Sequence, residues 1–256
     1  MIRRVVAVAQ NTFKEAVRDK VLYILVIFAL CLLLSSYVIA PLALGEGGKI
    51  LRDLGLSLVP LFGLAIVVIL GTSLVYKEME RRTIYILVSK PLRRWEFLLG
   101  KYLGLLLVLA VVALLMTLFF YGVLYWFYGG GEARLLWGIW MSFLELAVIA
   151  AVAIFFSSLS SPTLSAVFTL AIYVAGHWTQ DLRAFSAKLP GSGLKGLGTF
   201  FYYALPNLEF FNVKNDVVHG IAVNPSHALW ALGYAVLYSS ALLALASAIY
   251  ERKSFK

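Results

Sequence analysis

Residues 135–180 read LLWGIWMSFLELAVIAAVAIFFSSLSSPTLSAVFTLAIYVAGHWTQ. Among these 46 residues the only charged side chain is that of Glu145. The apolar runs are long enough to cross a ~30 Å hydrocarbon core twice. Between them, the polar break SSLSSP at 157–162 ends in a proline, which favours a helix start. The stretch therefore predicts two membrane-spanning helices, 135–159 and 163–180, joined by a tight turn.

The composition of the whole chain indicates the same class of protein. Of its 256 residues, 62% are hydrophobic and only 14% are charged, whereas soluble domains carry about 25% charge. The single cysteine, Cys31, excludes an internal disulfide and a cysteine-cluster metal site. The formal charge of +9 fits the Lys and Arg bias of cytoplasmic loops and contact with membrane lipid better than nucleic-acid binding, which we do not expect.

Four further apolar runs extend the pattern, at residues 21–42, 54–76, 99–128 and 226–250. Together with the first two runs they predict six membrane-spanning helices. The expected fold is an all-α integral membrane protein with a single transmembrane domain, residues 1–256. Because the spans use roughly half of the chain, we expect no second, soluble catalytic domain.

Positive charge is distributed unevenly between the alternate loops. If the N-terminus lies inside, 15 Lys and Arg residues face the inner side and 7 face the outer side. Cytoplasmic loops carry such an excess of Lys and Arg. We therefore expect both termini in the cytoplasm, at a prokaryotic inner or plasma membrane.

Residues 2–18 precede the first predicted span. Apolar residues recur there near helical spacing, while Arg3, Lys14, Glu15 and Arg18 fall largely elsewhere. The pattern predicts an amphipathic helix that lies in the inner interface. The alternative is a basic flank that only orients the first span.

The most charged stretch joins the second and third spans. Residues 77–101 read KEMERRTIYILVSKPLRRWEFLLGK, and ten of these 25 residues are charged. We expect a short helix up to about residue 88, a break before Pro91 and a second helix start at Arg93. A mixed-charge surface of this kind suits a protein partner. Alternatively, the stretch is a solvated charge run that only sets the topology.

The same stretch resembles a known family. EMERRT at 78–83, SKPLRR at 89–94 and FLLGKYLG at 97–104 are similar to the segment between the second and third helices of ABC transporter permeases of the type-2 exporter family. The predicted layout of six spans, with a long outer segment before the last one, also agrees with this family. LPNL at 205–208 and FNVK at 211–214 are similar to one subgroup of these permeases.

The resemblance implies a permease that forms the translocation path as a dimer, which we interpret as a homodimer. It also implies that the permease has no catalytic residues or cofactor of its own. A separate cytoplasmic ATP-binding subunit would bind ATP and Mg, and the linker 77–98 would transmit its movement. The residues implied in this coupling are Glu78, Glu80, Arg81, Arg82, Thr83, Pro91, Arg93, Arg94 and Lys101. In agreement, the chain contains no G-x-x-x-x-G-K-[ST] loop, and we interpret GSGLKG at 191–196 as a flexible turn.

The segment 181–225 lies outside in this topology and is rich in aromatic residues. It predicts a re-entrant or interface-resting pair of short helices, which is tolerated at membrane depth only when packed on protein. The resemblance implies an outer gate over the transport path. Its candidate residues are Phe200, Phe201, Pro206, Phe210 and Phe211. An ordinary loop with aromatic anchors is the alternative.

Glu145 falls near the middle of a span, where a carboxyl is costly unless it faces the bundle or stays protonated. In the functional interpretation, Glu145 lines the transport path or acts as a conformational lock. In the structural interpretation, its carboxyl is hydrogen-bonded to a Ser, Thr or Tyr of a neighbouring helix or of a second copy of the chain. We interpret His177 as an interfacial histidine. Gly100 and Gly104 form a G-x-x-x-G motif, which allows close helix packing.

Two other functional classes stay open. A self-sufficient secondary transporter needs paired intramembrane charges or broken helices in two matching halves, and among these features the chain offers Glu145 alone. An intramembrane enzyme needs a catalytic set, but no H-E-x-x-H occurs and the three histidines fall outside or at the outer rim. For the substrate, analogy with such exporters favours an apolar or amphipathic molecule.

Overall fold

The computed structural model describes residues 2–39, 47–74, 93–179, 192–221 and 223–252. Every regular element in these ranges is a helix, which confirms the predicted all-α class. The elements are α1 (Ile2–Val17), α2 (Lys20–Ile39), α3 (Gly47–Ile66), η2 (Val67–Gly71), α6 (Arg94–Tyr128), α7 (Leu135–Leu159), α8 (Pro162–His177), α10 (Ser192–Ala204), η3 (Glu209–Phe211), α11 (Lys214–Val218) and α12 (Pro225–Arg252).

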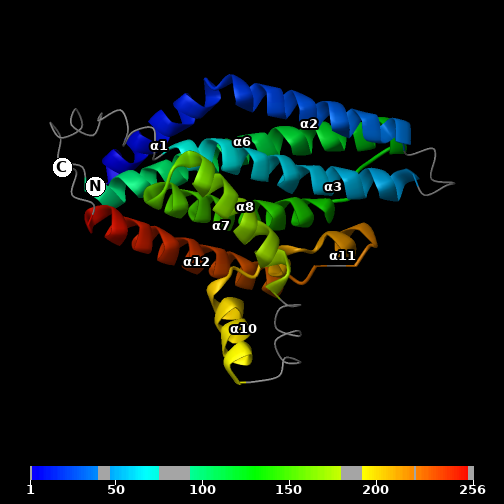
Figure 1. Ribbon diagram of the computed structural model, residues 1–256. Coiled ribbons are helices and arrows are strands. Elements are labelled where there is room, and N and C mark those ends of the chain that lie inside the picture. Colours follow the sequence, from blue (N-terminus) through cyan, green and yellow to red (C-terminus); the bar gives the residue numbers. More distant parts are fainter. Residues whose placement is uncertain (1, 40–46, 75–92, 180–191, 222, 253–256) are drawn as a thin grey trace.

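The long helices form one bundle. Helices α2, α3, α6, α7, α8 and α12 run alongside one another, and α1 begins at the end of the bundle where α12 ends (Figure 1). Four helices in the described part of the chain are long and apolar enough to cross a membrane: Gly47–Leu74, Arg94–Tyr128, Leu135–Leu159 and Pro225–Ile249. By the same measure α2 and α8 are shorter apolar helices. The structure thus supports four of the six predicted spans, and the count of six stays a prediction.

Helix α7 lies at the centre of the bundle. It contacts α3, η2, α6, α8, α11, η3 and α12. Its middle residues, Val148 to Ala151, are fully buried. A helix that is apolar on all sides is expected to be buried on all sides. A polar group in the middle of α7 therefore faces other helices of the protein.

The helix that begins at Gly47 contains a π-helical turn, η2, shortly before it ends at Leu74. Next to this turn, the hydroxyl of Ser157 in α7 donates to the carbonyl oxygen of Thr72 at 2.6 Å. A π-turn interrupts the regular backbone bonding of a helix and is frequent at functional sites. Here it lies close to Leu74, where the described helix ends.

Helix α10 projects away from the side of the bundle (Figure 1). It begins at Ser192 and so takes up most of the GSGLKG string. The interpretation of that string as a flexible turn is therefore wrong. A glycine inside a helix costs only about 1 kcal/mol relative to alanine, which the other residues of a 13-residue helix can offset.

Candidate functional site

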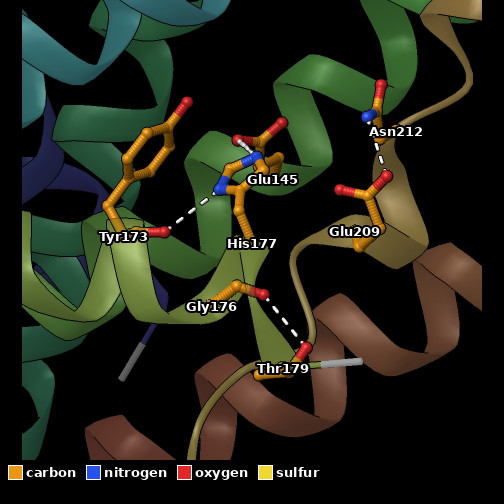
Figure 2. A network of polar contacts seen from close by, with 7 residues as sticks. All are labelled: Glu145, Tyr173, Gly176, His177, Thr179, Glu209 and Asn212. Atoms are coloured by element: carbon orange, nitrogen blue, oxygen red, sulfur yellow. Dashed lines mark hydrogen bonds and ion pairs between the residues drawn. The ribbon is translucent and has the colours of Figure 1, made fainter. Parts of the chain in front are cut away.

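Glu145 and His177 form a polar centre inside the bundle. Glu145 lies near the middle of α7, with 2% of its side chain exposed, and His177 ends α8. The distance from Glu145 Oε1 to His177 Nε2 is 3.3 Å, so that the imidazole points toward α7 (Figure 2). The ion-pair partner of Glu145 is thus a histidine on the neighbouring helix. The hydroxyl of Tyr173 on the same helix also interacts with Glu145, which agrees with the Ser, Thr or Tyr partner that the sequence suggested.

The second ring nitrogen of His177 is also engaged. Nδ1 lies 3.0 Å from the carbonyl oxygen of Tyr173, one helical turn earlier (Figure 2). Since a carbonyl oxygen can only accept, Nδ1 carries a proton and donates it to this bond. The rings of Tyr173 and His177 pack with their centroids 4.7 Å apart. These contacts fix the imidazole with Nε2 within ion-pair distance of Glu145 Oε1, a buried oxygen that makes no hydrogen bond within the described residues.

The last turn of α8 also holds the chain that returns from α10, residues 205–213, which we call the return segment. The backbone N–H of Leu208 donates to the carbonyl oxygen of Gly176 at 3.0 Å. The hydroxyl of Thr179 lies 3.1 Å from that same carbonyl and 3.2 Å from Asn207 Oδ1. A side chain on Gly176 would prevent this approach, because its Cβ would lie 2.7 Å from Leu208 Cγ.

Helix α12 covers the other side of the return segment. The hydroxyl of Tyr234 accepts the backbone N–H of Asn207 at 2.9 Å, and its ring centroid lies 6.0 Å from that of Phe211. His227 Nε2 lies 3.0 Å from the carbonyl oxygen of Phe210, to which it donates. The backbone of the return segment is therefore bonded to protein on two sides, through α8 and through α12.

The structure brings together three of the five gate candidates. In the return segment, Pro206 and Phe211 are buried and Phe210 is half-buried. Phe200 and Phe201 instead belong to α10, where their side chains are 64% and 50% exposed. These two aromatic residues lie apart from the site at the end of α8.

At the end of the bundle that holds the start of α1, this helix is seated on the beginning of α6. The buried face of α1 consists of Val5, Ala9, Thr12 and Ala16. The G-x-x-x-G motif of α6 makes room for this face, since a Cβ on Gly104 would lie 2.6 Å from Thr12 Cβ and 2.8 Å from the Ala9 carbonyl oxygen. A Cβ on Gly100 would lie 3.0 Å from the Val5 carbonyl oxygen.

Ion pairs fasten the same two helices. Lys101 Nζ lies 3.6 Å from Glu15 Oε2, with 1% of the lysine side chain exposed. Arg4 Nη1 lies 3.9 Å from Glu96 Oε2, which also accepts the backbone N–H of Arg93 at 3.1 Å. The latter bond closes the first turn of α6 as an N-terminal cap. Lys101, a residue implied in coupling, is thus paired with α1.

The linker is described only at its end. Arg93 is exposed before the first residue of α6, and Arg94 is half-buried as that first residue. The remaining coupling residues lie outside the described residues: Glu78, Glu80, Arg81, Arg82, Thr83 and Pro91.

An apolar groove of about 730 Å³ lies between α6 and α12. One wall consists of large side chains of α6 from Trp95 to Leu106, and the other mainly of small residues of α12 from Ser239 to Ala248. Such a groove suits the apolar part of a ligand. Within the described ranges, no group of three or more His, Cys, Asp or Glu side chains could hold a metal ion.

A comparison with protein families agrees with a membrane protein. Residues 6–255 match the family described as ABC-2 family transporter protein. Because the match covers nearly the whole chain, the chain belongs to this family and is a membrane component of an ABC transporter, a permease. A comparison with curated proteins gave no match.

Proposed function

We propose that the chain is the membrane-spanning permease subunit of an ATP-driven exporter. Two copies form the translocation path, and a separate cytoplasmic subunit binds ATP and Mg and hydrolyses the nucleotide. The observation that carries the proposal is the family membership over residues 6–255. In this arrangement the chain crosses the membrane six times, with both termini in the cytoplasm.

The coupling route begins at the linker, residues 77–98. The contacts around the start of α6 support this route, because they make α1 and α6 one unit. The glycines of α6 admit α1 closely, and the pairs Lys101–Glu15 and Arg4–Glu96 hold it there. A movement of the linker is transmitted to the first turn of α6, and α1 moves together with α6.

The gate lies at the other end of the bundle, in the return segment. Pro206, Phe210 and Phe211 close the path there, and Glu145 acts as a lock through His177. What supports this role is the packing: the last turn of α8 contacts Glu145 and also bonds the return segment. A shift of α8 therefore changes the contact with Glu145 and the contact with the return segment together.

The transported molecule is apolar or amphipathic. The groove between α6 and α12 supports this substrate class, since large apolar side chains and small residues line it at the level of the spanning helices. Such a molecule enters from the surrounding lipid and needs no charged binding site.

One observation favours a second candidate, a secondary transporter driven by protons. The pair of Glu145 and His177 is the kind of intramembrane polar pair on which proton relays are built. The two candidates differ in their energy source. A proton gradient would drive transport by proteoliposomes of the chain alone in a secondary transporter, whereas the exporter needs its ATP-binding subunit and ATP.

The test of the exporter is binding of the ATP-binding subunit to linker variants. We expect Glu80→Arg and Arg94→Glu to weaken pull-down of this subunit about thirtyfold or more, because stranding one partner of a desolvated charge pair costs ~2 to 5 kcal/mol. Asp53→Arg, an exposed charge reversal near the start of α3, is the matched control and should bind normally. Normal binding by both linker variants would refute the coupling role.

A further inference from the structure

The contact between Glu145 and His177 requires a proton. Nδ1 of His177 is a donor, because its partner is the carbonyl oxygen of Tyr173 at 3.0 Å. In a neutral imidazole the other nitrogen, Nε2, then carries a lone pair. An ionised carboxylate has only acceptor oxygens. At 3.3 Å, Nε2 and Glu145 Oε1 would repel each other unless one of them holds a hydrogen.

The same single proton satisfies the pair in either of two forms. It rests on Nε2, which gives an imidazolium beside a carboxylate, or on Oε1, which gives a neutral imidazole beside a carboxylic acid. Both forms have no net charge, as a carboxyl with 2% of its side chain exposed inside a helix bundle favours. Without that proton, a buried carboxylate faces a lone pair.

Few other charged or titratable groups act on this pair. From α8 itself, the hydroxyl of Tyr173 lies near Glu145. From η3, the carboxylate of Glu209 acts on His177 and is bonded to Asn212 Nδ2 at 2.9 Å (Figure 2). Helix α7 brings no other charged side chain between residues 135 and 159. In the described part of the chain, His177 is the basic side chain that pairs with Glu145.

The proton site is connected to the return segment through one turn of helix. His177 follows Gly176, whose carbonyl oxygen accepts the backbone N–H of Leu208. Thr179 completes the junction with Asn207. If the imidazole leaves Glu145, the end of α8 loses its polar contact with α7, and the backbone that holds the return segment moves with it.

We propose that Glu145 and His177 form a binding site for one proton that latches the end of α8, and with it the return segment, against α7. Loss of the proton releases the latch. This regulation rests on the proposed role of the return segment as a gate. It makes gate opening dependent on pH, independently of nucleotide.

The test measures exposure of the return segment directly. Val213 is buried in that segment, whereas Asn215 is exposed on the adjoining helix α11. In a Cys31→Ser background, Val213→Cys and Asn215→Cys are each reacted with a membrane-impermeant maleimide, in membrane vesicles of the complex without nucleotide. The ratio of the two rates cancels the pH dependence of the thiol itself. We expect this ratio to rise about tenfold from pH 6 to pH 9.5, the effect of ~1.4 kcal/mol on the opening equilibrium.

Two variants identify the titrating group. In Glu145→Gln the amide N–H donates to Nε2 permanently, so the ratio should stay at its low value at every pH. In His177→Ala the latch is absent, so the ratio should be high at every pH. Gel filtration in detergent checks that each variant is folded. If His177→Ala does not fold, the conservative variant Glu145→Gln still decides the test.

The other histidines provide the controls. His219→Gln alters an exposed residue, and His227→Gln alters the histidine that bonds the return segment itself. Both should keep the tenfold pH response. A response that persists in Glu145→Gln, or a flat ratio in the parent protein, overturns the latch. A flat ratio together with intact ATP-driven transport refutes the latch alone, whereas the expected ratios without any ATP dependence of transport refute the exporter.

Discussion

The seat of α1 on α6 allows a sharp test by substitution of Gly104. Even a methyl group there would come 2.6 Å from Thr12 Cβ and 2.8 Å from the carbonyl oxygen of Ala9. The backbone oxygen cannot rotate away, so α1 itself must shift. A leucine adds three more carbons at the same place. We therefore predict that Gly104→Leu lifts α1 from α6.

The size of the effect follows from the cost of overpacking, about 1 to 3 kcal/mol for extra carbons in a packed site. This range corresponds to roughly a 5- to 150-fold change in the ratio of docked to undocked α1. The matched control is Gly122→Leu in the same helix, since no atom lies within 4 Å of a Cβ on Gly122. Both substitutions change helix propensity alike, so their difference reports packing alone.

The assay uses a cysteine at Thr12, a residue that is fully buried beneath α6. With Cys31 replaced by serine, Thr12→Cys should react slowly with a maleimide in detergent, and about 5- to 150-fold faster in Gly104→Leu. In Gly122→Leu the rate should not change. An unchanged slow rate in a folded Gly104→Leu protein would refute the seat of α1 and, with it, the unit of α1 and α6 that we propose for coupling.

Two further predictions concern the other end of the bundle and the topology. Gly176→Val should expose the return segment, because a Cβ at Gly176 already lies 2.7 Å from Leu208 Cγ; proteolysis at the segment should accelerate, and equal rates in the parent protein and the variant would contradict the packing. Single cysteines at Arg94 and Lys195, in a protein without Cys31, should label from opposite faces of the membrane, and labelling of both from the outside would contradict the predicted topology.

The membrane class and the break between α7 and α8 could be predicted from residues 135–180 alone. The reason is that length and hydropathy decide both features locally. In the structure α7 ends at Leu159 and α8 begins at Pro162, as the SSLSSP break indicates. The interfaces between helices depend instead on which surfaces meet, and such contacts are encoded only weakly in a single sequence.

The pairing of Glu145 with His177 was missed because each residue was judged on its own helix. A signal for it exists. Glu145 lies 14 residues before the end of α7 at Leu159, and His177 lies 15 residues after the start of α8 at Pro162. In an antiparallel hairpin with a tight turn, positions equally far from the turn lie at the same depth, so the two side chains can meet.

Of the five gate candidates, the structure places three in the return segment and two in α10. Aromatic residues and Pro206 indicate that the segment is not an ordinary solvated loop, and Phe211 is indeed buried. The separation of Phe200 and Phe201 from the site could not be predicted, because it depends on the place where α10 ends and on the contacts of the return segment with Tyr234 of α12. The G-x-x-x-G motif predicted close packing without naming α1 as the partner.

We expect this permease to move its substrate only through a separate ATP-binding subunit. The most direct measurement is ATP hydrolysis in proteoliposomes that contain the purified chain alone, or the chain together with an ATP-binding subunit that co-purifies with it. We predict no hydrolysis by the chain alone, since it lacks a phosphate-binding loop, and hydrolysis by the complex that Arg94→Glu abolishes. Hydrolysis by the stringently purified chain, or full activity of the complex with Arg94→Glu, would contradict the account.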